Sequence, residues 1–283
     1  MSKKNRSLRK ERHARRSQLR FESLENRIVL DAYGAAVLAD NPLAFFRFNE
    51  GTGTTANDAT ANSIDGTIEN AVYTFNGGGR SAGAGDYALS FDGTGDTVRV
   101  VDDSMSINVD AFNPIVTANA VTIEFWQFGG GLQPRADTIF GGYGNSGERR
   151  LQSHLPWSNS IVYWDTDSSG GQRLQQTQND STKWKGQWNH WTFVKSATTA
   201  TIYQNGQQFA TRSAGTAIMD MESFFIGSAI NGSSSYQGLI DDFAVYTSAL
   251  SASQVAAHYQ ATFDDAYAAN EDSLLTVNST SGL

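Results

Sequence analysis

The segment at residues 238–259, GLIDDFAVYTSALSASQVAAHY, constrains the fold more than any other part of the 283-residue sequence. Its first half alternates apolar and polar residues, a two-residue period that is typical of a half-buried β-strand. The apolar positions of this strand are Leu239, Phe243 and Val245. In its second half, Ser251 and Gln254 have capping-box spacing, in which each side chain bonds a backbone N–H at a helix start. The segment therefore predicts a strand that leads directly into a short helix.

Composition agrees with an all-β fold. The sequence has 27 Gly, 16 Phe, 10 Tyr and 6 Trp, and few of its stretches have helix-type periodicity. A single β-sandwich of roughly 200 to 250 residues is an ordinary domain size that buries a full core. The sequence has no Cys, which excludes disulfides and thiolate metal sites. It also lacks a run of about 18 uncharged apolar residues, the length that a transmembrane helix requires.

Four further segments resemble successive parts of one protein family. They are, in chain order, FFRFNEGTGTTANDATANSIDGTIEN (residues 45–70), YALSFDGTGDTVRVV (87–101), AVTIEFWQF (120–128) and GQWNHWTFVK (186–195). With the strand and helix at 238–259, they resemble the laminin-G-like, concanavalin A-like jelly-roll family from about Tyr33 to Thr262.

The resemblance implies an all-β fold, an antiparallel β-sandwich jelly roll with a short C-terminal helix. It identifies residues 45–70 with the opening strand and its loop, 87–101 with the next hairpin, and 120–128 and 186–195 with two central strands. It also implies a secreted binding module rather than a soluble metabolic enzyme.

The N-terminus is strongly basic although the chain as a whole is acidic. Residues 1–20 carry a local charge of +8, whereas the chain has a net charge of −8, so the other 263 residues sum to −16. Such an arm binds nucleic acid or an anionic membrane surface, or it is a solvated disordered tail. Residues 19–32, LRFESLENRIVLDA, resemble the LEPR-XLL motif of exported surface proteins of planctomycete bacteria, with Asn26 where that motif has Pro. We therefore expect residues 1–32 to be a basic disordered tail with an export or anchor-like motif, and no nucleic-acid partner.

The C-terminus resembles the beginning of another domain. Residues 267–283, YAANEDSLLTVNSTSGL, resemble the first strand of the cadherin-like repeats of giant bacterial surface proteins. A lone strand cannot bury its apolar face. We therefore expect a jelly-roll domain at 33–262, followed at 263–283 by a linker or the truncated start of a cadherin-like repeat. The chain is then a monomer or part of a longer multidomain protein.

Two hairpins are predicted in the middle of the chain. Asn205-Gly206 separates two β-rich runs, and Asn-Gly accepts the positive φ that a two-residue hairpin turn requires. In residues 150–167, a turn at Ser158-Asn159 places His154 opposite Tyr163. The face expected to pack in the core carries Leu155, Trp157, Val162 and Trp164. The opposite face carries Gln152, His154, Tyr163 and Asp165.

That second face is the candidate ligand-binding site. An aromatic ring stacks on the C–H face of a sugar, while amide, imidazole and carboxylate groups bond its hydroxyls. The sequence therefore suggests glycan binding by Gln152, His154 and Tyr163. The alternative is a half-exposed strand face on which these residues bond only one another.

A calcium site is the second candidate. Ca²⁺ takes six to eight oxygen ligands, which an Asn- and Asp-rich loop can supply. The family's Asp-x-Ser-Gly-Asn pattern falls on Asp58 and Asn62, with Ala61 where Gly is usual, and Asp241 lies in the strand at 238–246. We expect Asp58, Asn62 and Asp241 to bind a structural calcium ion, or else the loop to be an Asx turn without an ion.

The sequence gives little support for an enzyme. Glucanases of this sandwich class use a Glu-x-Asp-x-x-Glu strand, whereas Glu124 stands alone in IEFWQF. The four His residues have no zinc-binding spacing. We therefore expect a non-catalytic extracellular module that binds glycan or protein at the cell surface. The alternatives are a spacer or adhesin segment without a small ligand, and an auxiliary module of a carbohydrate-active enzyme.

Overall fold

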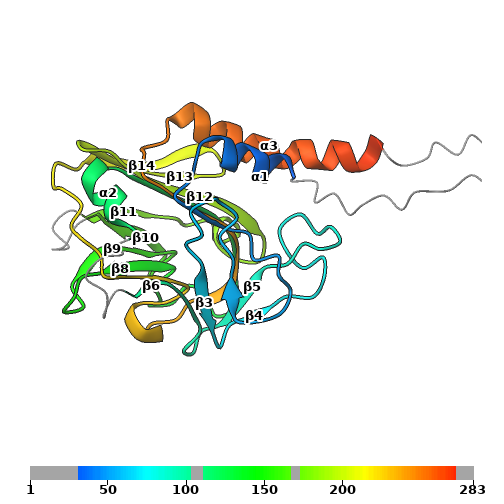
Figure 1. The fold of residues 1–283 in the computed structure, drawn as a ribbon, viewed down its shortest axis with the longest axis horizontal. Coiled ribbons are helices and arrows are strands. Elements are labelled where there is room, and N and C mark those ends of the chain that lie inside the picture. Colours follow the sequence, from blue (N-terminus) through cyan, green and yellow to red (C-terminus); the bar gives the residue numbers. More distant parts are fainter. Residues whose placement is uncertain (1–30, 103–110, 167–172, 272–283) are drawn as a thin grey trace, which may run out of the picture.

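The fold is a sandwich of two antiparallel β-sheets, seen in a computed structural model that describes residues 31–102, 111–166 and 173–271 (Figure 1). Sheet A contains, in spatial order, β14 (Gln207–Ser213), β13 (Thr199–Gln204), β12 (Trp188–Lys195), β7 (Val121–Gly129), β16 (Gln237–Tyr246), β5 (Leu89–Asp92) and β4 (Val72–Tyr73), and β1 (Ala44–Phe46) also pairs with β16. Sheet B contains β11 (Arg173–Thr177), β10 (Ile161–Asp165), β9 (Arg149–His154), β8 (Phe140–Tyr143), β15 (Ser223–Ile226), β6 (Thr97–Asp102), β3 (Gly66–Glu69) and β2 (Thr55–Ala56). The predicted jelly-roll sandwich is therefore confirmed.

The core between the two sheets is dominated by aromatic side chains. Phe125 of β7 stacks on Phe243 of β16 with ring centroids 5.3 Å apart, and Phe140 of β8 packs edge-on to Phe193 of β12 at 5.2 Å. All four rings are fully buried. Burial of a large apolar side chain contributes about 1.5–3 kcal/mol each, so such contacts are the main force that holds sheet A to sheet B.

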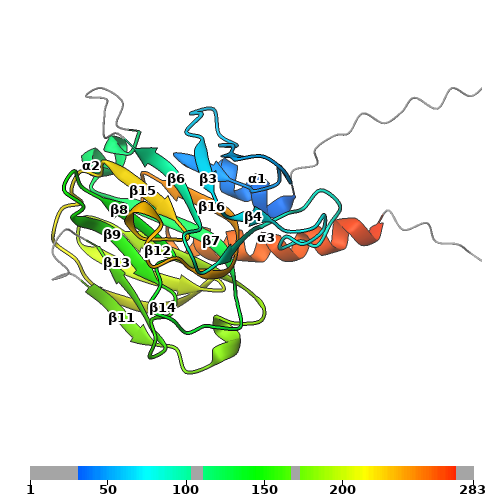
Figure 2. The same cartoon turned by 90° about the horizontal axis from the view of Figure 1, so that it is seen from below.

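Two helices cover the outer face of sheet A (Figures 1 and 2). Helix α1 (Ala32–Ala39) and helix α3 (Ala252–Glu271) contact each other and enclose a second apolar cluster with this sheet. Tyr33 of α1, Val255 of α3 and Trp126 of β7 are buried in that cluster. Sheet A is thus packed on both faces. Sheet B has no comparable pair of helices among residues 31–102, 111–166 and 173–271.

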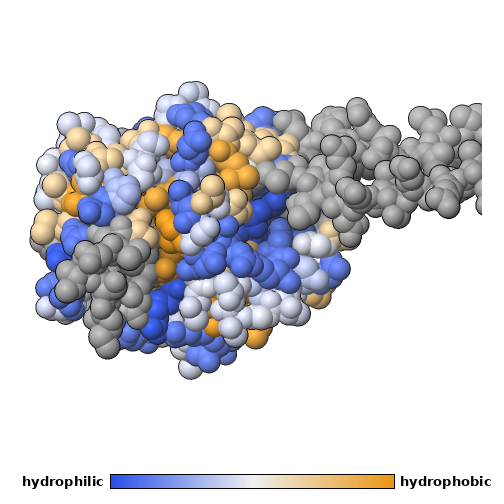
Figure 3. Space-filling model, viewed as in Figure 1, coloured by the Kyte–Doolittle hydropathy of each residue, from blue (hydrophilic) through white to orange (hydrophobic). Residues whose placement is uncertain are grey.

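The remaining helices are short. Helix α2 (Asn113–Ala118) inserts Ile115 into the core, and two 3₁₀ turns lie at η1 (Ser181–Lys183) and η2 (Ile230–Gly232). In the part of the chain that the structure describes, no helix is long and apolar enough to cross a membrane. In the space-filling view, polar residues dominate the visible surface and apolar ones form a narrow band (Figure 3).

Several local predictions are confirmed. Asn205 and Gly206 form the turn between β13 and β14, with φ of 50° and 73°. The segments at 120–128 and 186–195 form β7 and β12, which pair with each other inside sheet A. The predicted capping box is also present, because Ser251 N donates to Gln254 Oε1 at 2.9 Å and Gln254 N donates to Ser251 Oγ at 3.3 Å.

Other local expectations differ from the structure. The expected hairpin at 87–101 is not one, since β5 pairs within sheet A and β6 within sheet B, so the chain crosses between the sheets there. Leu239 was expected to share a face with Phe243. A β-bulge at Asp241 and Asp242 adds one residue to β16, so the residues before the bulge alternate in the opposite sense to those after it. Ile240 therefore enters the core and Leu239 is only partly buried.

The expected domain boundaries are also crossed by structured segments. Helix α3 runs past residue 262 and includes 267–271, where the start of a strand was expected, while 272–283 lie outside the described residues. At the other end, Asp31 caps α1, so the fold begins inside the segment that was expected to be a tail. Residues 1–30, which carry the basic arm and most of the LEPR-XLL-like motif, lie outside the described residues.

Candidate functional site

The hairpin of β9 and β10 has the predicted register. His154 lies opposite Tyr163, and Ser160 N donates to the Trp157 carbonyl at 2.8 Å, which closes the turn around Ser158 and Asn159. Leu155, Val162 and Trp164 belong to the core, as expected. Trp157 was expected there too, but that expectation is wrong. Its ring is partly exposed and lies 4.5 Å from His154 and 5.7 Å from Tyr163 between ring centroids, on the polar side.

The three predicted ligand-binding residues lie together on the outer face of sheet B. Gln152 is 5% exposed, His154 is 3% exposed and Tyr163 is 6% exposed, so this face is more closely packed than the sequence suggested. Tyr163 in particular is enclosed. The guanidinium of Arg173 lies 4.0 Å from its ring centroid, and the His154 ring lies 4.2 Å away. The ring of Tyr163 is therefore placed to hold His154 and Arg173 in position. The ring of Trp157 is more exposed than that of Tyr163.

Gln152 and His154 each have a buried acceptor atom that no described residue bonds. The amide Nε2 of Gln152 donates to Thr138 Oγ1 at 2.8 Å, which leaves Oε1 without a partner among the described residues. His154 Nδ1 lies in hydrogen-bond contact with the carbonyl of Asp137, and Nε2 has no partner within the described part of the chain. Burial lowers the pKa of His154 to about 4, so the ring is neutral at pH 7. Its proton therefore lies on Nδ1 and its Nε2 is an acceptor.

A charged pair closes one side of this face. Arg173 of β11 donates from Nε and Nη2 to the two oxygens of Asp165 at 2.7 and 3.0 Å. This bidentate geometry is the strong form of an Arg–carboxylate pair, and it fixes Arg173 above Tyr163. Asp165 is almost fully buried, and its carboxylate is held in place by the ion pair with Arg173.

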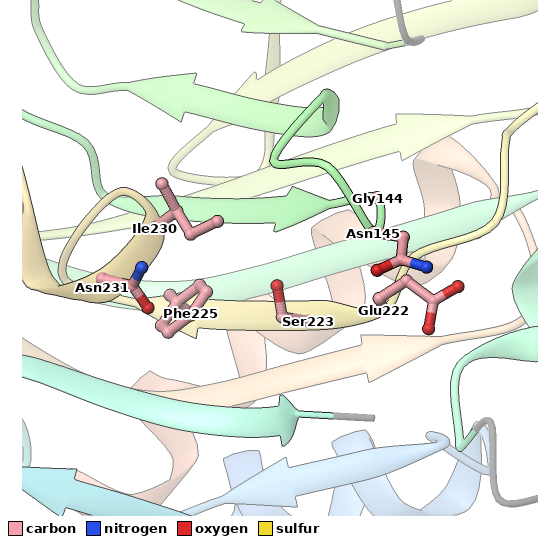
Figure 4. Close-up of a pocket in the computed structure, with 7 residues that line it drawn as sticks. All are labelled: Gly144, Asn145, Glu222, Ser223, Phe225, Ile230 and Asn231. Atoms are coloured by element: carbon pink, nitrogen blue, oxygen red, sulfur yellow. The ribbon is translucent and has the colours of Figure 1, made fainter. Parts of the chain in front are cut away.

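The same face continues across β8 and β15 to a pocket that sequence reasoning missed (Figure 4). Gly141 of β8 lies beside Gln152 of β9 and beside Phe225 of β15, so the three form one row across the sheet. The ring of Tyr143 covers Gly141 so closely that a Cβ there would lie 2.7 Å from it. The pocket beyond has a volume of about 240 Å³. It is lined by Gly144, Asn145, Glu222, Ser223, Phe225, Ile230 and Asn231.

The three residues predicted to bind calcium already have protein partners. Both oxygens of Asp58 accept hydrogen bonds, four in all, from Phe45 N, Thr60 N, Thr60 Oγ1 and Ile64 N. A carboxylate offers about four lone-pair sites, so this arrangement is that of an Asx turn that organises its loop. Asn62 donates from Nδ2 to the Leu43 carbonyl at 2.9 Å.

Asp241 lies in a different environment from the Asp58 loop. It is fully buried and accepts from the backbone N–H groups of Arg80 and Asp242. Burial, with the neighbouring charge of Asp242, raises the pKa of Asp241 well above its usual value. No group of three or more Asp, Glu, His or Cys side chains within the described ranges could hold a metal ion. Calcium binding by Asp58, Asn62 and Asp241 stays a prediction.

A buried ring of charges, which no local sequence pattern indicates, lies beside Asp241. Arg80 donates from Nε to Asp242 Oδ2 and from Nη2 to Asp31 Oδ2, both at 3.1 Å. Arg47 pairs with the same two carboxylates. Because Asp31 caps α1 and Asp242 lies in the bulge of β16, the ring fixes the start of α1 to sheet A.

Glu124 also has partners that its sequence neighbourhood does not reveal. His258 of α3 lies with Nδ1 2.9 Å from Glu124 Oε1, and His190 of β12 lies with Nε2 3.2 Å from Oε2. The hydroxyl of Tyr246 donates to the same carboxylate. His258 Nε2 also contacts Asp40 Oδ2 at 3.0 Å, so His258 lies between two carboxylates.

The protonation states in this cluster follow from burial and charge. Burial alone would raise the pKa of Glu124, but the nearby His258 and His190 outweigh it and hold that pKa well below its usual value. Burial would lower the pKa of His258, but Glu124 and Asp40 raise it. For His190, burial dominates and lowers the pKa. His258 is therefore the charged partner, and His190 donates to Glu124 as a neutral ring.

Comparison with known proteins agrees with the architecture. A family model described as the concanavalin A-like lectin/glucanases superfamily matches residues 92–256. Among curated proteins, no match is found. Domain 4 of the extracellular arabinanase AbnA from Geobacillus stearothermophilus, solved with arabinotriose, is 19% identical, with a TM-score of 0.56 over 77% of this chain and 98% of that domain.

Two other similar structures come from larger proteins. The binding domain of botulinum neurotoxin DC, solved with SialylT, is 13% identical, with a TM-score of 0.57 over 79% of this chain and 52% of that one. The sialidase of Trypanosoma rangeli, solved with the inhibitor DANA, is 13% identical, with a TM-score of 0.56 over 76% of this chain and 32% of that one. This chain thus spans about half the length of the first of these chains and about a third of the second. At such identities the likeness concerns the fold.

Proposed function

This chain belongs to the concanavalin A-like lectin/glucanases superfamily, and from that premise we propose that it is a non-catalytic extracellular module that recognises glycans with the outer face of sheet B. The main observation behind this proposal is a pair of buried hydrogen-bond acceptors, Gln152 Oε1 and His154 Nε2, that lack a partner among the described residues. An unsatisfied buried acceptor costs about 1–3 kcal/mol. Sugar hydroxyls donate hydrogen bonds, so a glycan would satisfy both atoms once the side chains that close them off from solvent move aside.

The arrangement of the layers favours the outer face of sheet B, rather than the outer face of sheet A, as the glycan-binding surface. The outer face of sheet A is covered by α1 and α3, with Tyr33 and Val255 packed against it. On sheet B, the partly exposed ring of Trp157 lies beside His154. A sugar stacked on Trp157 would bring its hydroxyls toward the Gln152 and His154 acceptors, the combination of ring and polar groups that glycan sites use. Tyr163 then acts as a positioning residue.

We propose binding rather than hydrolysis, because the nearby Asp165 carboxylate is already paired with Arg173. Glycosidases use a pair of carboxyl groups, about 5–5.5 Å apart in retaining enzymes and about 6.5–9.5 Å apart in inverting ones. Burial raises the pKa of Asp137 to about 7, but its Oδ2 accepts a hydrogen bond from Gln133 at 2.7 Å. The carboxylate of Asp165 is held by Arg173. We therefore expect the glycans that bind to be recovered uncleaved.

The test is an array of neutral and acidic glycans probed with the full chain and with Gln152→Met. Met keeps the shape of Gln and removes the unsatisfied acceptor, so the fold should be retained while binding weakens by about 1–3 kcal/mol, or roughly 5- to 150-fold. The matched control is Gln208→Met, at an exposed position of β14 in sheet A, which should bind like the unchanged protein. Absence of binding to every glycan would contradict the proposal and favour a spacer segment.

A further inference from the structure

One histidine joins the two helices that cover the outer face of sheet A, where α1 lies beside α3 (Figure 1). His258 of α3 is 2% exposed, and each of its ring nitrogens faces a carboxylate. Nδ1 lies 2.9 Å from Glu124 Oε1 on β7, and Nε2 lies 3.0 Å from Oδ2 of Asp40, the residue that follows α1. A neutral imidazole has one N–H, whereas an imidazolium has two. Only a protonated His258 therefore donates a hydrogen bond to both carboxylates.

We propose that His258 is a proton-operated latch: its imidazolium ties the end of α1 to α3 and sheet A, and loss of the proton releases that end while the sandwich stays folded. A neutral ring has one N–H for two carboxylates, and its lone pair repels the other carboxylate. Glu124 is fully buried, whereas the Asp40 side chain is 26% exposed and can turn toward water. The remaining proton should therefore stay on Nδ1, and the contact with Asp40 is the one that breaks.

The segment that the latch releases is short, because both of its ends are fixed. At the start of α1, the Asp31 carboxylate is paired with Arg47 and Arg80. Arginine keeps its charge throughout the neutral pH range, so this end does not respond to pH. The chain joins sheet A again at Leu43, whose N–H donates to a carbonyl of β16 at 2.7 Å. Opening should thus be confined to residues 32–42 and should expose the buried face of α1.

The groups around the latch keep their charge state while that of His258 changes. Burial opposes ionisation of Glu124, but His258 and His190 outweigh it and hold the pKa of Glu124 well below its usual value. Burial lowers the pKa of His190 and raises the pKa values of Tyr33 and Tyr246, so these three groups are neutral around pH 7. For His258 itself, burial would lower the pKa, but Glu124 and then Asp40 raise it. The groups that face His258 or its carboxylate partners are Glu124 on β7, Asp40 and Tyr33 at α1, His190 on β12 and Tyr246 on β16.

The test is amide hydrogen exchange of the full chain at about pH 5.5 and about pH 9, on either side of the usual His pKa of about 6.5. Protection factors correct for the pH dependence of intrinsic exchange and report local opening. Those of α1 should be about tenfold lower at the higher pH, the loss expected when one hydrogen bond to a charged group is removed. Low concentrations of urea should speed exchange in β7 and β12 but not in α1, because a local opening exposes little surface.

Three variants separate the latch from a contact that is merely structural. Asp40→Asn replaces the carboxylate by an amide that accepts from the protonated ring and donates to the neutral one, so α1 should stay closed at both pH values. Asp220→Asn, at an exposed position before β15, is the matched control and should keep the response to pH. His258→Gln has no titrating ring and should make exchange of α1 independent of pH. This variant also excludes Asp137, whose pKa burial raises to about 7, as the source of the response.

The outcomes decide the proposal whether or not the chain binds glycans. Protection of α1 that is equal at the two pH values would overturn the latch, as would a response to pH that Asp40→Asn retains. Exchange of α1 that depends on urea as steeply as that of β7 would mean that the contact only stabilises the whole fold, and would also overturn it. NMR of the ¹⁵N-labelled chain at about pH 9 should find the His258 proton on Nδ1, and a proton on Nε2 would contradict release of Asp40.

Discussion

Replacing Glu124 by Gln tests whether the buried cluster under α3 stabilises the fold. Gln keeps the shape of Glu124 and removes its charge, while the His258 ring would keep Asp40 as its only carboxylate partner in the cluster. Breaking one partner of a buried ion pair costs about 3–5 kcal/mol. Because His258 can release its proton in the variant, the lower end applies, and we expect a loss of about 3 kcal/mol in the free energy of unfolding.

The loss should be visible in thermal and urea unfolding of the full chain at pH 7. About 3 kcal/mol corresponds to a fall of roughly 6–12 °C in Tm for a domain of this size. The control is Glu148→Gln, in an exposed loop, which should leave Tm unchanged. In a double-mutant cycle, Glu124→Gln and His258→Gln should be non-additive because the two side chains are in contact. A Glu124→Gln protein whose unfolding free energy stays within about 1 kcal/mol of the parent would refute this account of the cluster.

Three further predictions concern pH, calcium and location. His258 has a raised pKa in the folded state, so the stability it contributes should be fully present below about pH 6.5 and be lost as pH rises through the folded pKa. Tm measured against pH should fall over that range, and His258→Gln should abolish this pH dependence. Calcium binding by Asp58, Asn62 and Asp241 requires that EDTA lowers Tm and that Asp58→Ala abolishes the response, because only the folded state assembles the ligands; an EDTA-insensitive Tm contradicts it. Extracellular location is proposed from the LEPR-XLL-like motif, and fractionation of the source cells should recover the protein at the envelope, whereas recovery from cytosol alone would contradict export.

Local patterns predicted those parts of the fold that depend on neighbouring residues. The turn at Ser158 and Asn159 sets the pairing of His154 with Tyr163, and this register is confirmed. The phase of β16 could not be predicted in the same way. Its bulge places Asp242 at φ 47°, and Asp241 and Asp242 bond Arg80, a residue far away in the sequence. A bulge stabilised by distant charges leaves no trace in a two-residue hydrophobic period.

The candidate site was only partly predictable for the same reason. Gln152, His154 and Tyr163 lie on one hairpin, so alternation alone places them on one face. The pocket needs β8, β15 and the η2 turn together, and strand order between sheets is not contained in any local pattern. Glu124 and His258 are 134 residues apart, and their contact follows from the packing of α3 on sheet A. The motifs at 238–259 predicted that helix without indicating which side chains it would bury.

The most direct test of glycan recognition by sheet B is NMR of the ¹⁵N-labelled full chain during titration with the strongest glycan from the array. We expect a neutral His154 with its proton on Nδ1, and a shift of the His154 Nε2 and Gln152 side-chain amide signals as the glycan saturates the protein. The Gln208 amide, on sheet A, should not shift. Shifts confined to other residues, with His154 and Gln152 unmoved at saturation, would contradict the central claim.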